Sequence, residues 1–345
     1  MNFTNSSIIA LTCGDVNSIS PLISLKSWLK LKNSSYMFFN IHNIDYMEKV
    51  ISYFNLDIKI AQIYDINEAK KVFSKYFPVM NINTQATNFL GEPTIANANL
   101  TLQSINKAIE LCKNNIINGL CTNPVDKNII NEYLKHQSIQ HTKFVGHTEY
   151  IAQNINVDNP MMLFATGVCD FKVLPITTHI PLSEVASSLS IKKVYDAIIN
   201  INLILQNQFN IQKPKIGILG LNPHCGDNGL LGTEEQSIII PAIKMAQSKN
   251  ILCSNPISSD CAFFGENKNK YDIIIGMYHD QVLAPFKALY FDSGVNITCN
   301  LPFIRTSPDH GVAFDIAKQS IASDSSLSSA IIMAHKLIIK KNEFI

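Results

Sequence analysis

The stretch GMYHDQVLAPFKALYFDSGVNITCNLPFIRTSPDHGVAFD, residues 276–315, combines an apolar strand signal with a dense set of polar side chains. It starts inside an apolar, β-rich run, residues 271–278, which predicts a buried strand. That strand ends on three polar residues, His279, Asp280 and Gln281. Polar groups at the carboxyl end of a parallel strand mark a ligand crevice in α/β proteins. The stretch therefore predicts an α/β fold whose ligand site lies at the strand ends.

Arg305, in the loop expected after a strand at residues 294–299, is the only arginine among the 28 lysine and arginine residues. Only a guanidinium offers a flat fork of donors that can grip a phosphate or a carboxylate with two parallel hydrogen bonds. We therefore interpret Arg305 as an anion clamp. The alternative is an ordinary surface salt bridge, since such pairs are common and contribute little to stability.

The length and composition bound the class of protein. A chain of 345 residues with 46% hydrophobic content can form one large or two medium domains with a substantial core. Its 28 lysine and arginine residues nearly balance 27 aspartate and glutamate residues, for a net charge of +1. No global field therefore draws the chain to nucleic acid or to an anionic membrane, and we expect a small-molecule partner.

The cysteines and the lengths of the apolar runs indicate the cellular compartment of the protein. Eight cysteines are scattered without a CxxC pair, mostly in apolar runs where free thiols behave as small hydrophobic side chains. They suggest a reducing cytoplasm. The sequence shows no export signal at its beginning and no uninterrupted apolar run of the roughly 18 residues that a membrane span needs. We therefore expect a cytoplasmic protein with no membrane segment.

Strand and helix signals alternate along most of the chain, which predicts a mostly parallel sheet. No GxGxxG follows the first strand, so a standard Rossmann dinucleotide site is not expected. No linker separates two halves, which favours two lobes built from interleaved segments. The stretch 64–96 shows weak periodicity and receives no assignment. Strands are expected at residues 8–12, 36–41, 58–63, 116–121, 161–165, 171–176, 216–221, 271–278 and 294–299, and helices at 22–31, 46–54, 97–113, 191–206, 280–289 and 326–341.

Three histidines, His179, His224 and His279, each follow an apolar run by one or a few residues. Residues at equivalent strand ends can converge on one edge of a sheet, and neutral imidazole is the commonest protein ligand for zinc and related divalent ions. A lone histidine at a strand end is more often structural. Three of them at the same topological place favour a metal site, although the signal is weaker than a local HExxH motif.

Four further residues are candidates for binding a phosphorylated polar substrate. His147 and Thr148 are expected at a helix N-terminus, where free backbone N–H groups favour an anion, or Thr148 only caps the helix. Lys287 on the helix at 280–289 and Asn296 on the following strand can reach the same site as Arg305. Their alternatives are a solvated helix lysine and a satisfied strand amide.

Six phrases of the sequence carry a family resemblance: CTNPVDK, FVGHTEY, TTHIPL, GLNPHCGDNGLLGTEE, MYHDQ and GVNITCNLPFIRTSPDHGVAFDIA. They resemble the 4-hydroxythreonine-4-phosphate dehydrogenase family of pyridoxal phosphate biosynthesis. The resemblance covers residues 8–340 and implies two α/β lobes around a central cleft, the α/β/α isocitrate and isopropylmalate dehydrogenase type of fold. It also implies homodimers with sites at the subunit interface. We expect one lobe, on the cofactor side, from residues 1–130 plus 294–345, and a second lobe, carrying the metal, substrate and dimer contacts, from residues 131–293.

The resemblance also implies roles for individual residues. One divalent ion, Zn, Mg or Co, would be bound by His179, His224 and His279. The loop HGVAFDIA would hold the adenosine part of NAD or NADP. Its expected contact residues are His310, Gly311 and Asp315. The residues implied to contact the substrate are His147, Thr148, Lys287, Asn296 and Arg305, with Asp260 close by.

The reaction that the resemblance implies is NAD(P)-dependent oxidation of the C3 hydroxyl of 4-phosphooxy-L-threonine to a ketone. The product, 2-amino-3-oxo-4-phosphooxybutanoate, then loses carbon dioxide to give 3-amino-2-oxopropyl phosphate. The metal would lower the pKa of the hydroxyl and the cofactor would accept the hydride. Lys287, Asp260 or a water relay could take the hydroxyl proton.

The first loop departs from the family pattern. The family reads close to GDPAGIGPE, whereas this chain reads GDVNSISPL from Gly14, so a proline and two glycines are replaced. Glycine permits positive φ and close backbone approach, and the loop must therefore be shaped differently here. This leaves two alternatives open: a dehydrogenase for a related phosphorylated four-carbon acid or an aromatic cis-dihydrodiol carboxylate, or a metabolite-binding homologue with weakened catalysis. A purely structural dimer would leave the three histidines and Arg305 unexplained.

Overall fold

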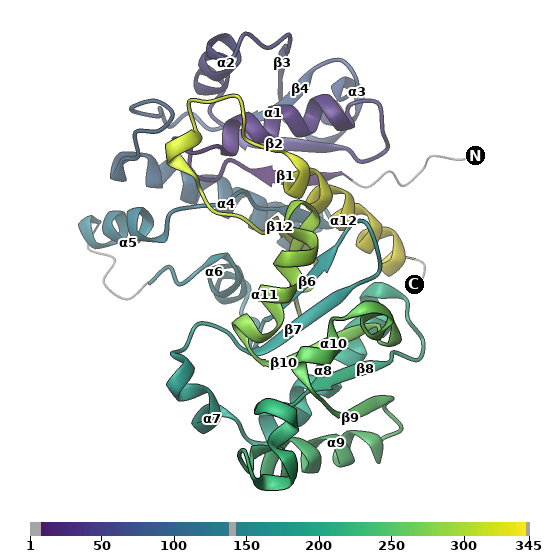
Figure 1. The fold of residues 1–345 in the computed structure, drawn as a ribbon. Helices are drawn as coiled ribbons and strands as arrows, with labels where there is room; N and C mark the ends of the chain where they lie inside the picture. Colours follow the sequence, from purple (N-terminus) through teal and green to yellow (C-terminus); the bar gives the residue numbers. More distant parts are fainter. Residues whose placement is uncertain (1–7, 138–142, 343–345) are drawn as a thin grey trace. The chain divides into compact units, whose positions relative to one another are not determined.

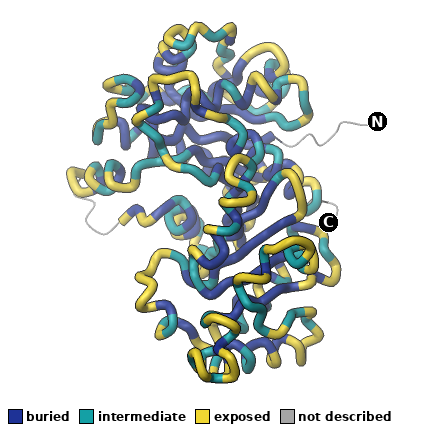
Figure 2. Tube along the Cα trace, viewed as in Figure 1, coloured by how far each residue is buried: buried dark blue, intermediate teal, exposed yellow. Residues whose placement is uncertain are grey.

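The computed structural model describes residues 8–137 and 143–342, which form two compact units. The first unit comprises the described residues of Met1–Met161 and Val295–Ile339, and the second those of Met162–Gly294 and Lys340–Ile345. Buried stretches run through both units, with exposed stretches around them (Figure 2). Most strands are buried, but the edge strands Ile60–Ile63 and Cys253–Ile257 are mainly half-buried or exposed. Within the described ranges no helix combines the length and apolar character that a membrane crossing requires.

The first unit is built on strands in the order β3-β4-β2-β1-β5-β12-β11, of which Figure 1 labels β1 to β4 and β12. Neighbours in this order are parallel except β11 and β12, which pair antiparallel with Thr298 opposite Arg305. Parallel order brings the carboxyl ends of these strands to one edge, where the first loop and the 122–127 loop begin. The strands are β1 (Ile9–Thr12), β2 (Phe38–His42), β3 (Ile60–Ile63), β4 (Phe77–Asn81), β5 (Gly119–Cys121), β11 (Gly294–Cys299) and β12 (Ile304–Pro308).

Several helices of the first unit begin at side chains that satisfy free backbone donors. Asp65 caps α3 by accepting from Asn67 and Glu68, and Asp126 caps α5 by accepting from Asn128 and Ile129. These caps fix where each helix leaves its loop. The helices are α1 (Ser20–Leu31), α2 (Ile44–Tyr53), α3 (Ile66–Val72), α4 (Ala98–Lys113), α5 (Lys127–His136), α6 (His147–Asn154) and α12 (Ser325–Asn342), with the short turns η1 (Ile95–Asn97) and η7 (Phe314–Ile316).

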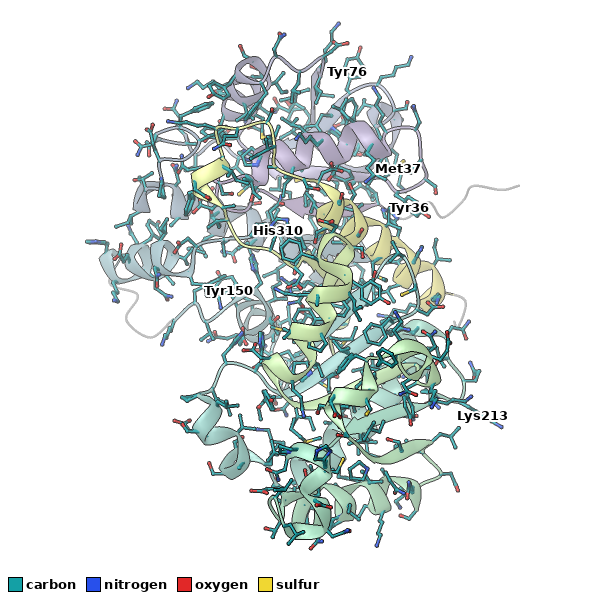
Figure 3. The ribbon with its side chains drawn as sticks, in the orientation of Figure 1. Tyr36, Met37, Tyr76, Tyr150, Lys213 and His310 are labelled. Atoms are coloured by element: carbon teal, nitrogen blue, oxygen red, sulfur yellow. The ribbon has the colours of Figure 1, made fainter. Side chains whose placement is uncertain are left out.

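Aromatic side chains fill the core of the first unit. The Trp28 ring packs edge-on against Phe77, with ring centroids 6.1 Å apart, and its Nε1 donates to the Phe73 carbonyl at 2.8 Å. Tyr36 and Met37 lie beside α12 (Figure 3), where the Met37 carbonyl is 2.8 Å from the His335 Nε2. These contacts tie α1 and α12, from opposite ends of the chain, to the same sheet.

The second unit has the strand order β6-β7-β10-β8-β9, parallel except for the antiparallel pair β6 and β7. Phe171 and Phe286 stack at 6.2 Å in its core beside Phe164 and Ile274. The strands are β6 (Met161–Thr166), β7 (Lys172–Thr177), β8 (Ile216–Leu219), β9 (Cys253–Ile257) and β10 (Ile273–Tyr278). The helices are α7 (Val185–Ser188), α8 (Ile191–Phe209), α9 (Ile240–Gln247), α10 (Ser259–Ala262) and α11 (His279–Tyr290), with the turns η2 (Leu182–Glu184), η3 (Pro223–Gly229), η5 (Gly265–Lys270) and η6 (Phe291–Ser293) and the π-helix η4 (Glu235–Ile239).

The α/β fold class with mostly parallel strands is confirmed, and one expectation about a site residue is wrong. Arg305 does not lie in a loop, because its segment pairs with β5 on one side and β11 on the other to form strand β12. The unassigned stretch 64–96 contains α3 and β4.

The two compact units also divide at a different place from the expected lobe boundary at residue 130. The division lies at residue 161, because α6 is held by contacts within the first unit: the Tyr150 hydroxyl donates to Asn106 on α4, and Thr148 meets Thr298 on β11.

Candidate active site

Arg305 is the centre of a polar cluster in the first unit. Its side chain is 3% exposed, and burial lowers the pKa of its guanidinium to about 10. Nη1 donates to the Thr298 hydroxyl at 2.8 Å and Nη2 to the Thr122 hydroxyl at 2.7 Å. In the part of the chain that the structure describes, Nε has no hydrogen-bond partner and no carboxylate forms an ion pair with Arg305. Arg305 is therefore not an ordinary surface salt bridge.

His147, Thr148 and Asn296 lie around this guanidinium. The Thr148 hydroxyl is 3.0 Å from the hydroxyl of Thr298, which itself accepts from Arg305. Asn296 is two residues from Thr298 on β11, so the two side chains share one face of the sheet. Its buried Oδ1 and the buried Nε2 of His147 have no hydrogen-bond partner among the described residues. Buried polar atoms are normally paired, so these two are free to meet a ligand.

The electrostatics of this cluster suit an anion. Burial and the neighbouring charges of Arg305 and Lys127 hold the pKa of His147 well below its ordinary value, so its imidazole is neutral at pH 7. Lys127, in the first turn of α5, places its Nζ 3.6 Å from where a Cβ on Gly146 would stand. Thr148 does not cap α6, because Gly146 is the N-cap and Thr148 is turned to Thr298. The Glu149 carboxylate lies 3.0 Å from the same point, and its charge also acts on Arg305. The cluster therefore combines two cations, one carboxylate and hydrogen-bonding atoms that have no partner among the described residues.

The expected cofactor loop lies against the first loop in the same unit. The Val312 carbonyl accepts from the Ile19 N–H at 3.2 Å, which joins the two loops. Gly311 is exposed and a Cβ there would meet no atom within 4 Å, so the backbone is open to a close approach. His310 is half-buried, with its Nδ1 3.0 Å from the Gly311 carbonyl (Figure 3), and Asp315 is exposed at the start of η7. This exposed loop fits a role in holding a bulky polar ligand.

Polar side chains shape the first loop in place of glycines. Ser18 donates to the Asp15 carbonyl at 2.6 Å, and Asn17 donates to the Phe89 carbonyl at 3.0 Å. Asn97 in turn donates to the Asn17 Oδ1 at 2.7 Å. Burial, with the charge of Asp126, raises the pKa of Asp15 to about 6. The loop is therefore a closed, buried network.

The second unit carries the three histidines. The rings of His179 and His279 lie with centroids 6.0 Å apart, and the His279 Nδ1 is 2.7 Å from the Asp280 carboxylate. A carboxylate on one imidazole nitrogen leaves the other oriented for a metal. His224 lies in η3, and its charge is one of the influences that lower the pKa of Asp260, after the hydrogen bonds from Ser258 and Cys261.

The fit to a metal ion is partial within one chain. Imidazole nitrogens are suitable donor atoms for a divalent ion. No three His, Cys, Asp or Glu side chains of residues 8–137 and 143–342 lie close enough together to hold one. Asp260 and the half-buried Lys287 belong to this unit as well.

The structure adds two threonines that the sequence did not single out. Thr122 and Thr298 orient the guanidinium of Arg305. The only available signal was indirect: Thr122 stands within the phrase CTNPVDK, and Thr298 is on the same strand as Asn296. Their partner lies 183 and seven residues away in the chain, respectively, and sequence periodicity carries no such information.

Comparisons with known proteins identify the family. A model described as pyridoxal phosphate biosynthetic protein PdxA matches residues 36–334. This chain belongs to the PdxA family. A relative from Bacteroides thetaiotaomicron, named 4-hydroxythreonine-4-phosphate dehydrogenase, agrees with the PdxA assignment. It is 34% identical over 329 residues, which cover 94% of this chain and 87% of the relative. A protein of the same name from Sulfurihydrogenibium sp. is 36% identical over 330 residues, 94% of this chain and 97% of its own.

Solved structures extend the PdxA likeness to three dimensions. The 4-hydroxythreonine-4-phosphate dehydrogenase of Klebsiella pneumoniae superposes with a TM-score of 0.81 at 27% identity, covering 97% of this chain and 99% of its own. A terephthalate 1,2-cis-dihydrodiol dehydrogenase from Burkholderia xenovorans, at 19% identity and a TM-score of 0.61 over 96% of this chain and 98% of its own, shares the fold alone. The PdxA family and the oxidoreductase class expected from the sequence are confirmed.

Proposed function

We propose that this chain oxidises 4-phosphooxy-L-threonine with NAD or NADP in pyridoxal phosphate biosynthesis. The product, 2-amino-3-oxo-4-phosphooxybutanoate, loses carbon dioxide to give 3-amino-2-oxopropyl phosphate. The observation that carries the proposal is the buried guanidinium of Arg305, which has two threonine hydroxyls as partners and, among the described residues, no carboxylate. Glu149 acts on this buried cation through its charge and forms no ion pair with it, so we expect a bound anion as the direct partner of the guanidinium. The names of the relatives supply the substrate.

The first unit binds and orients the phosphate end of the substrate. Arginine has five N–H donors, and two of those of Arg305 are used by threonines, so three remain for phosphate oxygens. Lys127 adds a second positive charge, and Asn296 and Thr148 offer further hydrogen bonds. A neutral His147 donates or accepts according to its tautomer and does not add a third charge.

Separate residues would hold the metal ion and the cofactor that act on the reacting carbons. A divalent ion bound by His179, His224 and His279 would supply a Lewis acid that lowers the pKa of the C3 hydroxyl. The nicotinamide of NAD or NADP, held through His310, Gly311 and Asp315, would accept the hydride. Three candidates for the proton acceptor are open. They are Lys287, Asp260 and a water relay.

A homodimer with its site at the subunit interface is part of the proposal. Its support is that the described residues of one chain bring together His179 and His279 but complete no three-ligand group. A symmetric dimer can complete such a group with a residue of the second copy. We also place the activity in the cytoplasm, because all eight cysteines are free thiols, as in reducing compartments.

The test measures reduction of NAD and of NADP by the purified protein with 4-phosphooxy-L-threonine, with and without a metal chelator. We expect turnover that the chelator abolishes. Arg305→Lys keeps the charge but loses the planar fork, so kcat/KM should fall about 10- to 100-fold, the equivalent of one or two charged hydrogen bonds.

Three outcomes would contradict the proposal or one of its parts. Substrate binding without reduction of either cofactor would favour the weakened homologue, with the changed first loop as its cause. Turnover of another phosphorylated four-carbon acid in preference would replace the substrate and keep the dehydrogenase. An Arg305→Lys variant with unchanged kcat/KM would remove Arg305 from the site.

A further inference from the structure

We propose that Gln281 is a positioning residue that holds together the three segments carrying His279, His224 and Asp260. It is 8% exposed and lies in the first turn of α11, two residues after His279. The inference rests on the proposed function for its catalytic meaning, but its structural argument uses only contacts within the second unit.

The side-chain amide of Gln281 bridges three places in the fold. Its Oε1 accepts from the Met277 N–H at 2.6 Å, at the end of β10. Its Nε2 donates to the Gly220 carbonyl at 2.6 Å, directly after β8, and to the Ser259 hydroxyl at 2.8 Å, in the first turn of α10. The two donor contacts span 61 and 22 residues of sequence. One buried amide therefore fixes the spacing of three strand-end segments.

Each of these segments leads directly to a candidate active-site residue. Met277 precedes His279 by two residues, Gly220 precedes His224 by four, and Ser259 is next to Asp260. The Asp260 carboxylate is also held from Ser258, whose hydroxyl donates to it at 2.6 Å. A shift of Gln281 would thus move all three candidate side chains at once.

Glu235 holds the same segment from its other side. Its carboxylate is 1% exposed, and Oε1 accepts from the N–H groups of Leu221 and Asn222, both at 2.7 Å, while Oε2 accepts from the Asn222 amide at 3.0 Å. Residues 220–222 are therefore held through the Gly220 carbonyl by Gln281 and through two N–H groups by Glu235. Hydrogen bonds to a buried carboxylate are among the stronger ones in a protein.

Residues 220–222 need this support because the backbone conformation of the turn that follows them is energetically unfavourable. Residues 224–228 all have positive φ: His224 at 51°, Cys225 at 54°, Gly226 at 77°, Asp227 at 42° and Asn228 at 56°. L-residues in this left-handed conformation cost roughly 1 kcal/mol or more each, and such strain persists only where the surroundings impose it.

Glycines make room for both supporting side chains. A Cβ on Gly276 would lie 2.9 Å from the Gln281 Oε1, and a Cβ on Gly226 would lie 2.7 Å from the Glu235 Oε2. A side chain at either glycine would therefore collide with the Gln281 amide or the Glu235 carboxylate.

The test replaces Gln281 by glutamate. Gln281→Glu keeps the size and the acceptor for Met277 but sets a carboxylate oxygen against the Gly220 carbonyl. We expect Co²⁺, titrated calorimetrically into the metal-free protein, to bind about 10- to 100-fold more weakly, as is usual when the support of a metal ligand is lost. The visible absorption spectrum of bound Co²⁺ should change, and kcat should fall more than KM rises. Hydrogen exchange should increase in residues 220–228 and 258–260.

The matched control is Gln247→Glu. Gln247 is an exposed glutamine of the same unit whose Nε2 donates to the Cys253 carbonyl at 3.0 Å, so the chemical change is the same and the place differs. It should leave Co²⁺ affinity, spectrum and kcat unchanged. If Gln281→Glu does not fold, Ser259→Ala removes one of the three contacts, and it should increase hydrogen exchange in residues 258–260.

Four results decide between the role of Gln281 and the proposed function. Unchanged Co²⁺ affinity, spectrum and hydrogen exchange in Gln281→Glu would overturn the inference, as would a lower thermal midpoint with all three unchanged, which is the mark of a purely structural residue. A wild-type protein that binds Co²⁺ but turns over no phosphooxythreonine would overturn the proposed function, whereas the Co²⁺ and exchange results would still decide the role of Gln281. A wild-type protein that binds no Co²⁺ would overturn both.

Discussion

Asp15 in the buried first loop shows how one residue can set the pH dependence of stability. Burial, with the charge of Asp126, raises its pKa to about 6 in the folded protein, against an ordinary value near 4. Between about pH 4 and pH 6 the folded state therefore binds more protons than the unfolded state, and stability falls as pH rises through this window. Above pH 6 the full cost of the buried charge is present.

Asp15→Asn removes that cost. The amide oxygen can still accept from the Asn17 N–H, which the carboxylate now binds at 3.0 Å. The variant should gain stability over wild type as pH rises from 4 to 7, by about 2 kcal/mol in the free energy of unfolding. Urea unfolding at both pH values measures it, and Asp57→Asn, at an exposed aspartate, should show no such gain. If the free energies of unfolding of Asp15→Asn and wild type differed by the same amount at pH 4 and at pH 7, the prediction would be wrong.

Several helices of this glycine-poor chain end on asparagine in the left-handed conformation that glycine usually adopts. Only 14 of 345 residues are glycine, and asparagine takes the left-handed position after several helices. After α8, Asn210 has φ 57° and ψ 37°, and its N–H donates to the Leu205 carbonyl. Asparagine tolerates this conformation better than most residues, but the conformational free-energy cost is lower still for glycine. The other asparagines of this kind are Asn55, Asn115, Asn156 and Asn250.

Substitutions at Asn210 test this interpretation. Asn210→Gly should leave the free energy of unfolding unchanged or slightly higher, whereas Asn210→Ala should lower it by about 1 kcal/mol, because a Cβ without a local polar partner disfavours positive φ. Asn207→Ala, three residues earlier on an exposed helical turn, should raise it by a few tenths of a kcal/mol through helix propensity. Equal effects of alanine at positions 210 and 207 would rule out the conformational cause.

Elements also show how far the sequence predicts this structure. Apolar runs predicted most strands, and the range 294–299 coincides with β11. The sequence did not predict strand β12, because Arg305, Thr306 and Ser307 are polar yet buried, and the hydrogen-bond partners of Arg305 come from other segments of the chain. Likewise the sequence placed His147, Asn296 and Arg305 as candidates. It could not reveal the role of Gln281, whose contacts depend on three strands reaching one edge.

At the scale of the whole molecule, the open question of assembly becomes a prediction about the metal ligands. His179 and His279 approach each other within one chain, whereas the described residues of that chain complete no three-ligand group. In the proposed homodimer we expect His224 to complete the group of the second copy. A two-fold axis then makes each site from two chains. A heterodimer of one His224→Ala chain and one His279→Ala chain would keep one intact site and lose both histidines from the other.

Two differently tagged variants allow that heterodimer to be purified and assayed. Each variant alone should be inactive and bind Co²⁺ poorly, because both of its sites lack a ligand. The heterodimer should recover about half of the wild-type Co²⁺ stoichiometry and turnover, since one of two symmetric sites is whole. The control pairs His179→Ala with His279→Ala, two residues that meet within one chain, and this heterodimer should stay inactive because every site lacks one of them. Recovery in neither heterodimer would mean that each chain builds its own site, with His224 brought to the pair by a movement within the second unit.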